Sequence, residues 1–173
     1  MPADNNSAPL RLCESLFFKP APAPAGPSAA DLLAEAKGSA PMGVLVGQAT
    51  GGNQASAERS AINQLKRAMN SIAGELVDAQ VASGRVSGSV ASDLKTNIAT
   101  ALDRGSAGTT QKVGSGADSA GKGWAIYSID KASALQTITS AVNAAKENVA
   151  AGNFNPNNGF DEAYAKAAAR EWK

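Results

Sequence analysis

The sequence contains no histidine, and this absence removes several kinds of chemistry at once. Without imidazole there is no serine–histidine or cysteine–histidine nucleophile, no histidine zinc site and no imidazole proton shuttle. The single cysteine, Cys13, excludes an intramolecular disulfide as well as thiolate zinc and iron–sulfur sites. We therefore expect a non-enzymatic protein without metal or cofactor, although carboxylates and lysines alone could still serve an enzyme.

Aromatic residues, net charge and long apolar runs are also scarce. Only 5% of the residues are aromatic, and the apolar 43% is built mainly from alanine, whose burial removes little surface from water. We expect a small, helix-rich core whose stability draws on subunit contacts, and hence a homo-oligomer. The formal net charge of +1 gives no electrostatic reason to expect nucleic acid as a partner. No apolar window of about 18 residues predicts a transmembrane segment.

The first residues do not have the pattern of a secretory signal. No basic region precedes Leu10–Phe18, and Arg11 and Glu14 interrupt this stretch. Leu10-Arg11-Leu12-Cys13 has the outline of a bacterial lipidation site, but Leu12 occupies a position that requires a small residue. We expect neither a signal peptide nor lipidation of Cys13, so these residues leave the location open.

Composition divides the chain into three regions. Residues 1–40 form an N-terminal arm with a proline- and alanine-rich linker and a short helix from Ser28 to about Lys37, 41–151 form an α+β core, and 152–173 a C-terminal loop and helix. The alternating prolines of residues 19–27 favour polyproline II, which is typical of a semi-rigid spacer. The apolar residues just before this spacer must be covered by the chain's own domain or by a neighbouring subunit.

Two short apolar runs, each leading into an amphipathic helix, account for most of the predicted core. Val44–Gly47 precedes a helix at about 55–79, and Trp124–Ile129 precedes one at about 131–151. Asn53 and Asp130 are placed to cap these helices. Apolar side chains recur at helical spacing along both: Ile62, Leu65, Met69, Ile72 and Leu76 in the first, and Leu135, Ile138, Val142, Ala145 and Val149 in the second.

The segment between these units predicts weaker elements. Residues 83–89 read as a loop or hairpin, 93–102 as a short helix that stops at Gly105, and 109–113 as a weak strand. The predicted fold is therefore α+β: a small antiparallel sheet of about three strands with the two long helices packed on one face, plus short terminal helices.

The C-terminal helix carries an aromatic stripe, because Phe160, Tyr164 and Trp172 share one face with Ala168. Such a stripe must be covered, either by the chain's own core or by another subunit. Together with the apolar residues of the N-terminal arm, these aromatic residues are our candidate subunit contacts: Leu16, Phe17, Phe18, Phe160, Tyr164 and Trp172.

Two glycine-rich segments could be mistaken for nucleotide-binding loops. Gly47 and Gly52 have the glycine spacing of a P-loop, but Asn53 and Gln54 stand where that motif needs lysine and a hydroxyl residue. In residues 114–121 the third glycine is misplaced for a dinucleotide fingerprint, and a strand follows instead of a helix. We interpret the first segment as a glycine-rich turn between a strand and a helix, and we do not assign nucleotide binding to the second.

The two strand-to-helix units resemble the Lpp-twenty-type lipoprotein domain, found in small outer-membrane lipoproteins and flagellar envelope accessory proteins. The first unit, Val46–Gly52 followed by an alanine-rich helix, is similar to the opening of that domain. The second, Trp124–Ala132, looks like its later strand running into a helix. The resemblance covers about residues 44–150 and implies a small α+β envelope protein of the periplasm or outer membrane, without a catalytic motif.

These observations lead to an expected function. The first hypothesis is a non-enzymatic structural or assembly protein of the bacterial cell envelope, which associates with itself or with other envelope proteins. The alternative is a self-assembling virion or filament subunit, because an alanine-rich domain with apolar arms at both ends suits a repeating lattice. A third is a small-ligand or peptidoglycan-binding module.

Overall fold

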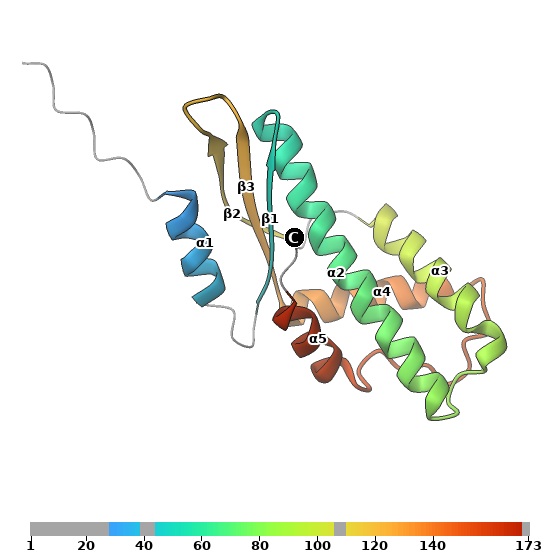
Figure 1. Ribbon diagram of the computed structural model, residues 1–173. Coiled ribbons are helices and arrows are strands. Elements are labelled where there is room, and N and C mark those ends of the chain that lie inside the picture. The colour runs from blue at the N-terminus through green and yellow to red at the C-terminus, as the bar shows by residue number, and fades with distance from the viewer. Residues whose placement is uncertain (1–27, 39–43, 106–109, 171–173) are drawn as a thin grey trace, which may run out of the picture.

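The computed structural model describes residues 28–38, 44–105 and 110–170. These residues form an α+β fold with a three-stranded antiparallel sheet, which confirms the predicted fold class. The elements follow one another along the chain as α1 (Ala29–Gly38), β1 (Val44–Gly51), α2 (Gln54–Ala82), α3 (Gly88–Arg104), β2 (Gln111–Ala117), β3 (Gly123–Asp130), α4 (Lys131–Lys146) and α5 (Phe160–Ala169). In Figure 1 the sheet lies between α1 and α2.

The strand order in the sheet is β1-β3-β2, so β3 is the central strand. The pairing of β1 with β3 runs without interruption from Val44 opposite Asp130 to Gly51 opposite Gly123. The pairing of β2 with β3 contains an irregularity between Lys112 and Gly114. Both outer strands therefore have one edge that is not paired to a strand among the described residues.

Helix α2 lies along one face of the sheet, where small side chains allow a close approach. Ala57 and Ala61 of α2 pack on Ala125 of β3, and all three are fully or almost fully buried. Helix α1 covers the opposite face. On that face the indole of Trp124 lies over β2, since a Cβ added at Gly116 would be 3.0 Å from its Nε1.

Helix α4 takes a different course from the expected one. Rather than lying on the sheet beside α2, it packs mainly on α3 and meets the sheet only near the end of β3. The reason is local: β3 ends at Asp130 and α4 begins at the next residue, so no loop is available to fold the helix back over the strands. The Asp130 carboxylate caps α4 by accepting a hydrogen bond from the Ser133 N–H at 2.8 Å.

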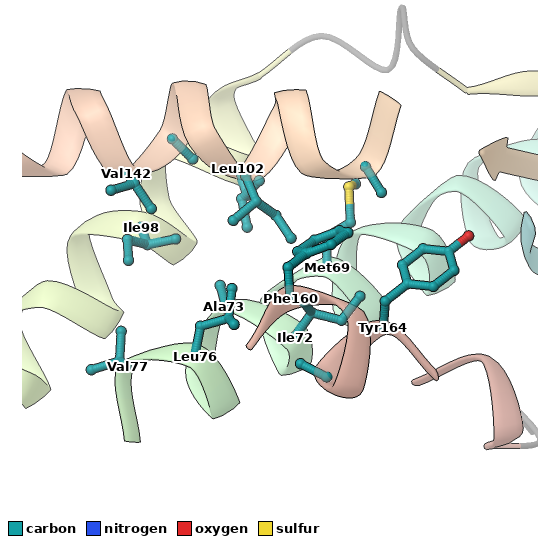
Figure 2. Packing of buried hydrophobic residues seen from close by; sticks show 14 of the residues in the cluster. Met69, Ile72, Ala73, Leu76, Val77, Ile98, Leu102, Val142, Phe160 and Tyr164 are labelled. Atoms are coloured by element: carbon teal, nitrogen blue, oxygen red, sulfur yellow. The ribbon is translucent and has the colours of Figure 1, made fainter. Parts of the chain in front are cut away.

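The main hydrophobic core therefore lies beyond the end of the sheet, where α2, α3, α4 and α5 meet (Figure 2). Four of the five residues in the predicted α2 stripe are buried there, and Ile62 is only partly covered. The largest side chains buried in this core come from all four helices and β3: Leu65, Ile72, Leu76, Leu94, Ile98, Ile129, Ile138, Phe160 and Tyr164.

A long loop between α4 and α5 is held to the helices by hydrogen bonds to its backbone. The buried Gln80 side chain donates from Nε2 to the Asn155 carbonyl at 2.7 Å and accepts from the Asn155 N–H at 2.9 Å. Lys146 Nζ donates to the Phe154 carbonyl at 2.7 Å. Gly152 and Gly159 lie in this loop with positive φ angles of 57° and 80°. Helix α4 ends at Lys146, earlier than predicted, and Gly152 belongs to the loop that follows.

Candidate functional site

The aromatic stripe of the C-terminal helix faces the chain's own core. Phe160 and Tyr164 are 1% and 2% exposed, their ring centroids are 5.7 Å apart, and both lie near Met69 and Ile72 of α2 (Figure 2). The Tyr164 hydroxyl also donates to the Ile129 carbonyl at 3.5 Å. Packing within the chain therefore leaves almost no exposed surface on these two candidate subunit contacts.

The other candidate subunit contacts are not placed by the structure. Leu16, Phe17, Phe18 and Trp172 lie outside the described residues. Helix α5, by contrast, packs in the same core as α2, α3 and α4. The C-terminal region predicted from the sequence therefore has no core of its own among the described residues.

The densest polar cluster of the described residues joins the first turns of α2 to the edge strand β2. We call it the clamp and define it as Gln54, Glu58, Lys112 and Ser115. Glu58 Oε1 accepts hydrogen bonds from Lys112 Nζ at 2.6 Å, from Ser115 Oγ at 2.7 Å and from Gln54 Nε2 at 3.1 Å. Gln54 Nε2 also donates to Ser115 Oγ at 2.8 Å. The clamp thus ties the irregular edge strand to the helix.

The electrostatics of the clamp stabilise charge on both of its ionisable groups. Hydrogen bonding from Lys112, reinforced by Ser115 and Gln54, lowers the pKa of Glu58 to about 2. The reciprocal hydrogen bond to Glu58 raises the pKa of Lys112. A carboxylate this acidic is a poor general base near neutral pH, and a fully protonated lysine is not a nucleophile. The geometry is that of a structural ion pair.

The remaining shifted groups behave in the same way. A hydrogen bond from the Ser28 hydroxyl lowers the pKa of Asp31, and one from the Ser133 hydroxyl lowers the pKa of Asp130. The ion pair with Glu162 raises the pKa of Lys166. Every one of these shifts favours the form that the group ordinarily has at neutral pH.

The glycine-rich turn between β1 and α2 uses its amide groups within the fold. The Asn53 side chain accepts from the Ser56 N–H at 2.8 Å, and the Ser56 hydroxyl is 3.2 Å from the Asn53 N–H. This reciprocal capping box occupies amides that a P-loop would present to phosphate. Gly123 packs against the same turn so closely that a Cβ there would lie 2.1 Å from the Asn53 carbonyl carbon.

One edge of β1 faces away from β3. The N–H of Gln48 points away from β3 and donates to Gln64 Oε1 of α2 at 3.0 Å. Because alternate residues of an antiparallel strand direct their backbone groups to the same side, Val46 and Thr50 also face outward. Within the described part of the chain, the N–H groups of these two residues have no hydrogen-bond partner.

Other charged side chains form single links between elements. Arg170, which follows α5, donates to Glu75 and to Ser71 of α2, at 2.6 Å in both cases. Lys95 of α3 pairs with Asp78 of α2 at 2.6 Å. Glu75 and Asp78, which lie three residues apart on α2, therefore bind different partners. Among the described residues, no group of three potential metal ligands comes together, and no helix is long and apolar enough to cross a membrane.

Comparison with known proteins adds no relative to these observations. The chain matches no protein-family model, no curated protein and no solved structure.

The sequence alone predicted neither the clamp nor the hydrogen bond between Gln64 and the outer edge of β1. Glu58 and Lys112 lie 54 positions apart, and Gln48 and Gln64 are 16 apart. Neither pair has a spacing that indicates contact. The only signals were the predicted turn before α2 and the prediction that a weak strand lies near Lys112.

Proposed function

We propose that this chain is a non-enzymatic structural or assembly protein of the bacterial cell envelope, which acts by associating with itself or with other envelope proteins. The observation that carries the proposal is the outer edge of β1. This strand has eight residues, none of them charged and none of them proline, and its outward amides at Val46 and Thr50 have no partner among the residues that the structure describes. Such an edge favours pairing with another chain.

The direction of the pKa shifts supports a structural role. Acid–base catalysis requires groups whose pKa lies near the working pH, whereas the shifted groups described here all move away from neutrality. These charged groups cap helices or link one element to another, as expected of charges with a structural role.

The envelope setting is supported by the resemblance to the Lpp-twenty-type lipoprotein domain. The two segments that carry it, Val46–Gly52 and Trp124–Ala132, contain most of the neighbouring strands β1 and β3, and the second also contains the start of α4. One structural unit therefore accounts for both parts of the resemblance.

Two measurements test this proposal separately. Fractionation of cells that express the native protein should recover it with the envelope, and a cytoplasmic, unprocessed protein would contradict the setting. Light scattering coupled to size exclusion should give a mass above that of one chain, which falls on dilution. A single-chain mass at every concentration, together with no envelope protein recovered after cross-linking, would contradict an assembly role.

A further inference from the structure

The edge of β1 raises the question of what pairs with it. The two outer strands of the sheet differ in how they are protected. β2 carries Lys112 and an irregular register, and the clamp holds it to α2. Irregularities and lysines are devices that keep edge strands from pairing. β1 is regular along its whole length, and the Gln64 side chain accepts from its outward Gln48 N–H, while α5 also contacts this strand. The structure therefore favours β1 as the accepting edge.

The sequence offers one segment suited to this edge. Leu10–Phe18 has nine residues without proline or glycine, against eight in β1, and Pro9 and Pro20 lie close to its two ends. Extended, it would place four apolar side chains and one carboxylate on one side: Leu10, Leu12, Glu14, Leu16 and Phe18. The segment is apolar enough to require a partner, and an added strand would satisfy its backbone as well as its side chains.

The spacer between this segment and α1 argues for a partner in another molecule. Residues 19–27 contain four prolines, and nine residues of polyproline II extend about 28 Å. Helix α1 contacts all three strands, and a three-stranded sheet is only about 10 Å wide. Since alternating prolines favour a stiff spacer, its sequence favours reaching outward over the sharp reversal needed to return residues 10–18 to the chain's own edge.

We propose that the free edge of β1 binds the segment Leu10–Phe18 of a second copy of this chain as an added strand. The inference rests on the proposed self-association and names its contact. Because one copy's arm meets another copy's sheet, the contact is heterologous, and repetition leads to rings or filaments. The Gln64 side chain competes for the Gln48 N–H, so it must move aside when the strand is added.

The test uses full-length chains and one change on each side of the contact. Gln48→Pro removes the outward N–H of the edge without removing a hydrogen bond to β3, and Gln48→Val is its matched control. Ser15→Pro interrupts the arm, and Ser15→Ala is its control. Circular dichroism and thermal unfolding check that each variant folds. We expect both proline variants to have the mass of one chain and both controls to associate like the unchanged protein.

Mixing the two proline variants gives the sharper result. Ser15→Pro retains a competent edge and Gln48→Pro a competent arm, so an equimolar mixture should form a one-to-one pair that cannot grow further. Should Gln48→Pro fail to fold, Ser15→Pro with its control still tests the arm, and Gln64→Ala, which frees the edge, should strengthen association. Association that survives Ser15→Pro would overturn this contact but leave self-association standing. An unchanged chain that is monomeric at all concentrations would overturn both.

Discussion

Gln80 shows how much one buried polar side chain can hold in place. Its amide makes two hydrogen bonds to the backbone of Asn155, and the side chain is 2% exposed. Since Asn155 is 75 positions further along the chain, these bonds anchor the loop that delivers α5 to the core. An apolar residue of similar size would leave the two backbone groups without protein partners.

We expect Gln80→Leu to lower the free energy of unfolding by about 1–3 kcal/mol, because two part-buried hydrogen bonds to the Asn155 backbone are lost. Urea denaturation measures the change. The matched control is Gln136→Leu at an exposed position of α4, which should stay within about 0.5 kcal/mol of the unchanged protein. Equal effects at the two positions would show that the Asn155 contacts do not hold the loop.

Glu58 gives the clamp a defined pH dependence. Its pKa in the folded chain is about 2, below the ordinary value of 4.5, so the folded state binds fewer protons than the unfolded state between these values. The stabilisation is thus fully present above pH 4.5 and is lost as the pH falls toward about 2. The lowered pKa values of Asp31 and Asp130 act in the same direction.

Glu58→Gln should therefore reduce the loss of unfolding free energy that occurs as the pH falls from 4.5 toward about 2. We expect the variant to be less stable than the unchanged protein at neutral pH and to approach it as the pH falls through this range. The difference should shrink at high salt, since the pair is partly exposed. Chemical denaturation over the acid range, with Glu147→Gln as an exposed control, measures it. A constant difference between the two proteins at all pH values would mean that the Glu58 charge is not responsible.

The turn that joins β1 to α2 depends on the close approach of β3. A Cβ at Gly123 would meet the backbone of Asn53 and Gln54 within 2.3 Å, whereas a Cβ at Gly52 in the same turn would meet nothing within 4 Å. Backbone atoms cannot rotate out of the way as side chains do. The start of the strand and the start of the helix must therefore separate if a side chain is added.

Gly123→Ala should cost about 1–3 kcal/mol or more of unfolding free energy, which is typical of overpacking against immobile atoms. Gly52→Ala should change it by no more than about 0.5 kcal/mol. Thermal unfolding of the two variants side by side gives the comparison. If Gly52→Ala proves the more destabilising change, the packing of β3 on this turn is not what excludes a side chain at Gly123.

The local elements were readable from the sequence because local chemistry determines them. Asn53 and Asp130 precede apolar helical stripes, and both are N-caps in the structure. Gly105 marks the end of α3 as expected. What the sequence did not indicate depends on contacts between distant residues. The course of α4 follows from the missing loop after Asp130, and the clamp joins positions in two different elements.

The same distinction applies to the candidate site. Helical spacing correctly placed Phe160 and Tyr164 on one face of α5, but spacing alone left open whether the chain's own core or a subunit covers them. The core covers both, because the loop anchored by Gln80 returns α5 to α2. The edge of β1 had no signal in the sequence, since an edge strand differs from a central one only in what pairs with it.

For the whole molecule, the burial of α5 separates folding from association. If Phe160 anchors the core, Phe160→Ala should lower the free energy of unfolding by about 3–5 kcal/mol, as for other large aromatic-to-alanine changes. Because the Phe160 ring is buried in the core that α5 shares with α2, the self-association of this variant, under conditions where it remains folded, should match that of the unchanged chain. Denaturation and light scattering on the same samples measure both properties, with the exposed Lys166→Ala on the same helix as control. A variant that stays stable yet no longer self-associates would show instead that α5 contributes to the subunit interface.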